Sequence, residues 1–431
     1  MSRRSGSADL PLHGGRVPAW LGQRMTRLGA VLCEAIVLEY GRAELLRRLS
    51  HPFWFQSFGA VMGMDWHSSG ITTSVIGALK RGLAPLSGEL GIHVCGGRGR
   101  HSRATPDELH AVGMRTGLDG AALARTSRLV AKVDSAAVQD GFDLYLHGFI
   151  VADDGQWVVI QQGMDGARRQ ARRYHWLSDG LESFVDAPHA AIDGPGQGRI
   201  VNLADRRAAA ARAAQIALLQ AEGATRLTRT LQTLEGVAAP VSPPASGDLF
   251  ATAVAQPHLS LPDHHDVRPA DIVLRRLHGA LAAAAEAGPR DFAELLEVPG
   301  VGARTVQALA TVAEVVHGTP CRFSDPARFS LAHGGKDGHP FPVPTQVLDR
   351  TIGVLKHAVT RARLGNEDRL AALRRLDAQA RALEANADGP SLLAFLEQER
   401  RDAHRYGGRS VSGWASAPDA VPDLHAAQDV A

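Results

Sequence analysis

The candidate catalytic residues of this chain are carboxylates, a lysine and histidines in its N-terminal half. Lys132 and Asp134 stand two residues apart on what we expect to be a short strand, and Asp140 follows them. Carboxylates bind Mg²⁺ or Mn²⁺, and a neighbouring lysine can steady the attacking water or the phosphate of a phosphodiester. The group predicts a divalent-metal site for phosphodiester cleavage, and an ordinary solvent-exposed lysine–aspartate pair is the alternative.

A polar loop earlier in the chain supplies further candidate ligands. Residues 65–74, Asp-Trp-His-Ser-Ser-Gly-Ile-Thr-Thr-Ser, precede a helix that we expect from Val75 to Arg81. A loop that leads into a helix N-terminus suits an anion, and the side chains of Asp65 and His67 are metal ligands elsewhere. The alternative is that the serines and threonines only cap the helix.

A β-hairpin is predicted between Phe142 and Gln162, because apolar and polar residues alternate on both sides of a turn. A two-residue type I′ turn at Asp154-Gly155 would fix its register. The expected pairs are Val151 with Val158, Phe149 with Ile160 and His147 with Gln162. The polar side chains that would gather at the open end are Asp143, Tyr145, His147 and Gln162. We interpret this half-polar face as part of a site, with a water-facing surface as the alternative.

Two basic segments have the composition of nucleic-acid-binding surfaces. Residues 96–103 place three arginines among glycines, and residues 168–176 combine four arginines with a tyrosine and a tryptophan. Arginine pairs with phosphate and aromatic rings stack on bases, above all on those of single strands. A solvated loop and a salt-bridged surface helix are the respective alternatives. The predicted contacts are Arg98, Arg100, Arg172, Arg173, Tyr174 and Trp176.

The turn within residues 295–305 is the most specific motif of the C-terminal half. Its sequence, Leu-Leu-Glu-Val-Pro-Gly-Val-Gly-Ala-Arg-Thr, predicts a helix, a tight turn and a second helix. Gly300 and Gly302 tolerate positive φ and carry no Cβ to keep a phosphate away. The second helix would direct its N-terminal N–H groups at that phosphate, and Arg304 and Thr305 could add contacts from its first turn. An ordinary Pro-Gly turn between packed helices is the alternative.

Residues 296–317 resemble the helix-hairpin-helix of base-excision DNA glycosylases. In the lyase-competent members of that family a lysine stands immediately before the threonine, and an aspartate follows further along the chain. This sequence has Arg304 in the lysine position, and Asp325 is offset from the aspartate position. Arginine stays protonated and forms no Schiff base. The resemblance therefore implies binding of the DNA backbone and argues against lyase activity.

A Gly-rich, hydrophilic run at 324–340 follows the second predicted helix. It carries Lys336, which we expect to line the nucleic-acid groove beside the turn or to dock onto the N-terminal domain. An ordered surface loop is the alternative.

Most of the chain also resembles an uncharacterised conserved-domain family of bacteria and archaea. The resemblance spans roughly residues 9 to 360 and implies no known activity. The segments that carry it stand at 53–56, 65–70, 131–134, 139–141, 159–164, 171–176 and 332–338.

The length and composition bound the architecture. The chain of 431 residues is long enough for two or three domains, and a net charge of +2 confines nucleic-acid binding to local patches. Three dispersed cysteines and the lack of a long apolar run favour a cytoplasmic protein with no membrane contact.

We expect an α+β or α/β N-terminal domain with a mixed sheet, followed by an all-α helix-hairpin-helix domain. The expected boundaries are 10–200 for the catalytic domain, 201–235 for a long helix, 236–262 for a Pro-rich linker, 263–363 for the helix-hairpin-helix domain, 364–406 for a helical extension and 407–431 for a disordered tail.

These patterns lead first to a cytoplasmic DNA-acting enzyme, a metal-dependent nuclease of DNA repair or processing. Nucleases of the restriction-enzyme type carry Glu-x-Lys or Gln-x-Lys after the aspartate, whereas residues 161–163 lack that lysine. The alternatives are a non-catalytic DNA-binding scaffold and a glycosylase-like enzyme that acts on a flipped base. The residues predicted for catalysis are Asp65, His67, Lys132, Asp134, Asp140, His147 and Gln162, with Asp65, Asp134 and Asp140 as ligands of Mg²⁺ or Mn²⁺.

Overall fold

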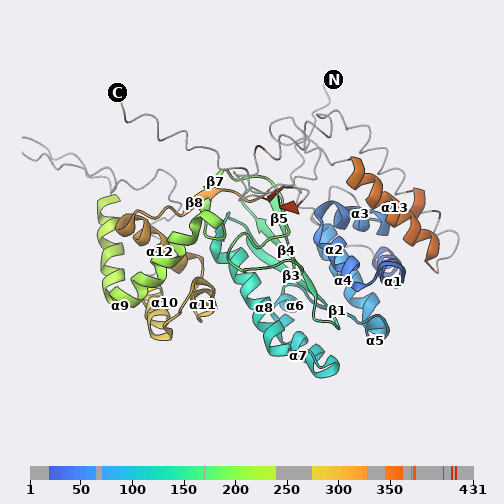
Figure 1. The fold of residues 1–431 in the computed structure, drawn as a ribbon, viewed down its shortest axis with the longest axis horizontal. Coiled ribbons are helices and arrows are strands. Elements are labelled where there is room, and N and C mark those ends of the chain that lie inside the picture. The colour runs from blue at the N-terminus through green and yellow to red at the C-terminus, as the bar shows by residue number, and fades with distance from the viewer. Residues whose placement is uncertain are drawn as a thin grey trace, which may run out of the picture.

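The structure is a computed structural model that describes residues 19–64, 70–168, 170–238, 274–327 and 345–362. It also describes short pieces at 370, 372–374, 401, 409–410 and 413–414. A twisted sheet lies at the centre, with helices packed on both of its faces (Figure 1). Of the predicted site residues, Asp65, His67 and Lys336 lie outside the described residues.

The central sheet has five strands in the order β1-β3-β4-β5-β6. Their bounds are Ile92–Arg98 for β1, Asp143–Ala152 for β3, Trp157–Asp165 for β4, Gln170–Leu177 for β5 and Ala191–Asp193 for β6. Each of its pairings is antiparallel. The expected mixed sheet is therefore wrong, because short turns join β3 to β4 and β4 to β5, and such turns permit only antiparallel pairing. The N-terminal part is an α+β fold.

One face of the sheet packs on helices from both ends of the described chain. The sheet side chains of this core include Leu146, Ile150, Val158 and Ile160. The helices are α1 (Ala19–Tyr40), α2 (Arg42–Ser50), α3 (Pro52–Met62), α4 (Gly70–Leu83) and α13 (Thr345–Arg361). A short 3₁₀ turn (Ala84–Leu86) and α5 (Ser87–Leu90) lead from α4 into β1.

The opposite face packs on α6 to α8, and α9 to α12 extend the same core beyond α8. Phe149, Val151, Val159 and Trp176 belong to this second core. The helices on this side of the sheet are α6 (Arg100–Arg103), α7 (Thr105–Thr116), α8 (Gly120–Lys132) with a π-helical turn (Val133–Ala137), α9 (Ala209–Ala238) after a 3₁₀ turn (Arg206–Ala208), α10 (Leu274–Ala287), α11 (Phe292–Glu297) and α12 (Ala303–His317).

The C-terminal helices are not a separate all-α unit within the described residues. Leu281, Leu295, Val301 and Leu309 of α10 to α12 belong to the same continuous core as the sheet residues Phe149 and Val159. A second sheet, in the order β2-β7-β8, joins the two parts. Its strands are β2 (Val138–Gln139), β7 (Arg199–Asn202) and β8 (Arg322–Ser324), so a strand directly follows the helices that were expected to stand alone. A two-residue pair, β9 (Arg409–Ser410) with β10 (Gly413–Trp414), lies within the tail that was expected to be disordered.

The segment around Lys132 and Asp134 is helical, and the predicted strand there is wrong. Leu123, Ala124, Ser127 and Val130 are buried along one side of α8. Their spacing matches the period of an amphipathic helix, not the alternation of a strand. Because residues i and i+2 share a face only on a strand, the helix separates the two side chains that were expected to act together.

The β3–β4 hairpin differs from its predicted register by one residue. Val151 pairs with Trp157, and His147 pairs with Gln161 rather than Gln162. The turn is longer than two residues, because the Asp153 N–H donates to Gly91 O at 3.0 Å and the Ala152 N–H donates to Gln156 O at 2.8 Å. A one-residue shift exchanges the faces of a strand, so Gln161 shares the face of His147 and Gln162 lies on the other.

None of the described helices combines the length and apolar character needed to span a membrane.

Candidate functional site

The β5 residues that were expected to bind nucleic acid lie inside the protein. Arg172, Arg173, Tyr174 and Trp176 each have 0% of their surface exposed. A side chain without exposed surface offers nothing to a phosphate or a base, so their assignment as nucleic-acid contacts is wrong for this structure. Strand alternation divides them, with Arg172, Tyr174 and Trp176 on the α8 face and Arg173 on the α4 face.

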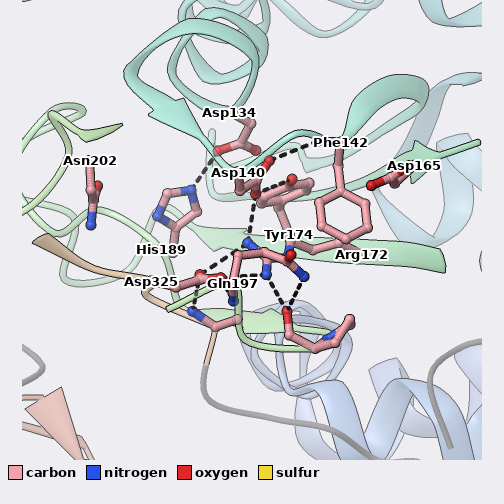
Figure 2. A network of polar contacts seen from close by, with 12 residues as sticks. Asp134, Asp140, Phe142, Asp165, Arg172, Tyr174, His189, Gln197, Asn202 and Asp325 are labelled. Atoms are coloured by element: carbon pink, nitrogen blue, oxygen red, sulfur yellow. Dashed lines mark hydrogen bonds and ion pairs between the residues drawn. The ribbon is translucent and has the colours of Figure 1, made fainter. Parts of the chain in front are cut away.

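Arg172 joins two buried carboxylates (Figure 2). Its guanidinium donates to Asp140 Oδ2 at 2.7 Å and, with both terminal nitrogens, to Asp325 at 2.6 and 3.0 Å. Tyr174 donates to the same Asp140 oxygen at 2.6 Å, and the Arg172 guanidinium lies 4.7 Å from the centre of the Phe142 ring. Burial alone would lower the pKa of Arg172, but the two carboxylates raise it above its ordinary value. Asp140 is therefore a partner of a structural ion pair in this structure.

Asp134 is the centre of a second buried network. His189 Nε2 lies 2.5 Å from Asp134 Oδ1, and Trp176 Nε1 donates to Oδ2 at 3.0 Å. Gln161 also donates to Oδ2, and its own Oε1 lies 2.7 Å from His147 Nδ1. The Ser127 hydroxyl, 2.9 Å from His147 Nε2, completes the network. We call the side chains of Ser127, His147, Gln161, Asp134, Trp176 and His189 the Asp134 network.

The direction of the hydrogen bonds in the Asp134 network follows from the charge of His147. Burial lowers the pKa of His147 below its ordinary value, so the ring is neutral near pH 7 and carries one N–H. Because the Gln161 amide nitrogen donates to Asp134, its oxygen must accept from His147 Nδ1. His147 Nε2 then accepts from Ser127. Ser127 and His147 are 3% and 4% exposed, so this serine–histidine pair has no direct access to a substrate.

Arg173 forms a third buried cluster on the other face of the sheet. It donates to Asp193 at 2.6 Å, to Gln56 at 3.0 Å and to His175 Nε2 at 2.9 Å. His175 Nδ1 lies 3.2 Å from Leu49 O. Burial and the nearby Arg173 charge lower the pKa of His175 well below its ordinary value. This neutral histidine accepts from Arg173 and donates to Leu49 O, which joins α2 to β5, while the Arg173–Gln56 hydrogen bond joins α3 to β5.

The turn between α11 and α12 is a predicted nucleic-acid-binding element that stays open to solvent. Gly300 takes a φ of 87°, in the left-handed region that glycine tolerates. Gly302 is extended, with φ −151° and ψ −170°, and caps α12 without a side-chain hydrogen bond. A Cβ at Gly302 would meet no atom within 4 Å. Arg304 is exposed in the first turn of α12, whereas Thr305 is 4% exposed and packs inward, so the predicted Thr305 contact is wrong.

The family of the chain follows from a comparison with known protein families. A family model described as "Protein of unknown function (DUF763)" matches residues 6–343. The chain belongs to this family. No curated protein and no solved structure matches the chain. The DUF763 match spans all three buried clusters and the α11–α12 turn, so the geometry itself must indicate what these residues do.

The other predicted site residues are scattered among these features. Lys132 is half-buried and donates to Val301 O in the α11–α12 turn. Gln162 is fully buried on the α4 face, away from His147. Arg98 is exposed, and its guanidinium carbon lies 5.8 Å from the centre of the Tyr145 ring. Arg100 is exposed at the start of α6.

The predicted metal site is not assembled by the described residues. No three histidine, cysteine, aspartate or glutamate side chains come together there in a group suited to a metal ion. Asp134 and Asp140 belong to different networks, and each uses its carboxylate oxygens to accept hydrogen bonds from buried donors. Because Asp65 and His67 are not described, a divalent-metal site that includes them stays a prediction.

Sequence reasoning did not assign several residues to these networks, and it considered Asp325 only beside the glycosylase-like motif. His189, Asp193 and Asp325 lie far along the chain from their partners and form no local motif. Gln161 was missed for a different reason, since the predicted turn was too short and placed Gln162 opposite His147.

Two buried histidines and the half-buried His51 predict a loss of stability in mild acid. Burial lowers the pKa of His51 from 6.5 to about 4, and the pKa values of His147 and His175 are lowered as well. Between pH 6.5 and about 4 the unfolded chain binds protons that the folded protein excludes. The free energy of unfolding should therefore fall as the pH drops through this window, by up to about 1.4 kcal/mol per pH unit for each histidine. Urea unfolding at pH 7.5 and pH 5 measures the effect.

A matched pair of variants attributes part of that effect to His51. His51 accepts from the Trp54 N–H at the start of α3, which requires a deprotonated ring nitrogen. Asparagine is a good N-cap without a titrating group, so His51→Asn should reduce the pH dependence, whereas His110→Asn on the exposed side of α7 should leave it unchanged. An identical pH dependence in the wild type and His51→Asn would contradict the assignment.

Proposed function

We propose that the protein binds the backbone of DNA without sequence preference, and that the turn between α11 and α12 is its phosphate-binding site. The observation that carries the proposal is the open backbone at Gly302, where α12 begins without a side-chain cap and a Cβ would meet no atom within 4 Å. A helix N-terminus with accessible N–H groups is a favourable place for a phosphate.

The surroundings of the turn support this assignment. Val301 is 0% exposed and anchors the middle of the turn in the core, while Pro299 and Gly300 before it are exposed. Arg304, exposed one residue inside α12, adds positive charge where a phosphate would lie. This geometry agrees with the helix-hairpin-helix interpretation of the sequence.

We do not extend the proposal to cleavage of DNA. The acids expected to hold the metal, Asp134 and Asp140, accept hydrogen bonds in the core, and the remaining candidates Asp65 and His67 lie outside the described residues. The proposal therefore matches the DNA-binding scaffold more closely than the nuclease or the base-flipping enzyme.

Gly302→Val tests the phosphate site without disturbing the fold. The φ of −151° at Gly302 is extended backbone that valine readily adopts, and the space around its Cβ is open. The added side chain should block the approach of a phosphate and weaken binding of a labelled DNA duplex at least about tenfold, measured by fluorescence anisotropy at fixed salt.

Gly166→Val is the matched control, because Gly166 is exposed in the turn between β4 and β5 and its Cβ would also meet no atom within 4 Å. It should bind DNA like the wild type. Equal affinity of the wild type and Gly302→Val, or no binding by the wild type, would overturn the proposed function.

A further inference from the structure

A row of basic side chains lies on α8 beside the α11–α12 turn. Arg125, Arg128 and Lys132 stand at positions i, i+3 and i+7 of the helix, a spacing that places them on one side of it. Arg125 and Arg128 are exposed and Lys132 is half-buried. We call these three residues the α8 row.

The two ends of the α8 row are attached to the two sides of the turn. Arg125 donates to both carboxylate oxygens of Glu297, the last residue of α11, at 2.6 to 2.9 Å. Lys132 donates to Val301 O inside the turn. Just beyond α8, Gln139 donates to Ala303 O at 2.9 Å, where α12 begins. The row and the turn therefore form one continuous surface.

Part of the positive charge on this surface is left without an ion-pair partner among the described residues. Glu297 pairs with Arg125, and the nearby Glu294 pairs with Arg290 instead. Arg128, in the middle of the row, has no hydrogen-bond or ion-pair partner within the part of the chain that the structure describes. Lys132 contacts a neutral carbonyl, and burial lowers its pKa from the ordinary value. An anion beside Lys132 would oppose that shift.

The length of the α8 row fits a run of phosphates. Seven residues of helix rise about 10 Å. The phosphates of one strand of a duplex follow one another at about 3.4 Å along the helix axis. A helix lying along the duplex axis would span about three of these steps, so the three basic groups can face neighbouring phosphates of one strand.

Building on the proposed function, we propose that the α8 row is the second half of the DNA surface and holds successive phosphates of the strand whose backbone enters the α11–α12 turn. Arg128 contributes a charge that has no ion-pair partner among the described residues. Arg125 and Lys132 also donate to Glu297 and Val301, and their remaining N–H groups can donate to phosphates. The turn selects a phosphate by close approach, while the row adds electrostatic attraction that does not depend on base sequence.

The salt dependence of DNA binding tests this proposal. Each phosphate contact that is lost should reduce the slope of log K against log salt concentration by about 1. Arg128→Ala should show that reduction and a several-fold weaker affinity for a labelled duplex at low salt, and Arg128→Glu should weaken binding further. Arg81→Ala is the control, because Arg81 is exposed on α4, which packs on the opposite face of the sheet.

The outcomes separate this inference from the proposed function. If Gly302→Val loses affinity while Arg128→Ala and Arg128→Glu keep the wild-type affinity and salt slope, the α8 row is not part of the surface and the turn alone binds. If the wild type does not bind the duplex, the proposed function fails and the α8 row has no role to extend. Equal losses in Arg128→Ala and Arg81→Ala would also overturn the inference, because the effect would then reflect total charge.

Discussion

Arg172→Ala is expected to lower the free energy of unfolding by about 3–5 kcal/mol, the cost of breaking a buried ion pair from one side. The substitution leaves Asp140 and Asp325 facing each other in the core without the cation that separates them. Tyr174 still donates to Asp140, and the backbone N–H of Gln197 still donates to Asp325, but neither donor supplies a charge. Urea or guanidinium unfolding of the purified variant measures the loss.

Arg168→Ala is the matched control for Arg172→Ala. Arg168 precedes the same strand, but its side chain is 54% exposed and its nearest carboxylate, Asp165, lies 3.5 Å away. Surface pairs of this kind contribute little, so the control should lose less than about 1 kcal/mol. Arg172→Ala combined with Asp325→Asn should be less destabilised than the sum of the two single variants, because it removes one of the two unpaired charges. A loss below about 1 kcal/mol in Arg172→Ala would show that water reaches the carboxylates and that the cluster is not a buried structural element.

The buried arginines also show why their role could not be recognised from the sequence. An arginine-rich segment with aromatic residues is typical of nucleic-acid contact, but the same composition serves a buried ion-pair network when acids from elsewhere surround it. The partners of Arg172 come from Asp140 in the loop before β3 and Asp325 after β8, and the partner of Arg173 is Asp193 on β6. No local pattern in the sequence records these long-range contacts.

Local periodicity predicted the strands of the β3–β4 hairpin but not their register. Alternating residues placed a strand on each side of the turn, and both strands are present. The register depended on the contact of Asp153 with Gly91, which belongs to the segment before β1. This contact lengthens the turn, and the resulting shift of one residue brought Gln161 into the Asp134 network instead of Gln162.

The change from strand to helix at Lys132 and Asp134 had the largest consequence for the predicted site. A strand would have directed both side chains to one face, as a metal-dependent nuclease requires. The helix and the π-helical turn after it direct Lys132 to the α11–α12 turn and Asp134 into the core. The residues expected to cooperate in catalysis thus contribute to a surface and to the core, respectively.

Asp134→Ala is expected to lower the free energy of unfolding by about 3 kcal/mol or more, because it removes the acceptor of three buried donors. Trp176 Nε1, His189 Nε2 and the Gln161 amide all donate to Asp134, and the cavity left by the carboxylate adds to the loss. The loss should be the same with Mg²⁺ and with a chelator, since these three donors take up the carboxylate oxygens. Urea unfolding under both conditions measures it.

Asp179→Ala is the control for Asp134→Ala, because the Asp179 side chain is 62% exposed and its nearest cation lies 4.0 Å away. It should change the free energy of unfolding by less than about 0.5 kcal/mol. If Asp134 is instead a metal ligand, the opposite result is expected. The free energy of unfolding of the wild type would rise on addition of Mg²⁺ or Mn²⁺. Asp134→Ala would be as stable as the wild type in chelator, and the metal would not stabilise it. That result would support the sequence-based prediction that Asp134 is a metal ligand. A loss of stability of the same size with and without the metal would establish Asp134 as the residue that links β4, β5 and the segment around His189 beneath α8.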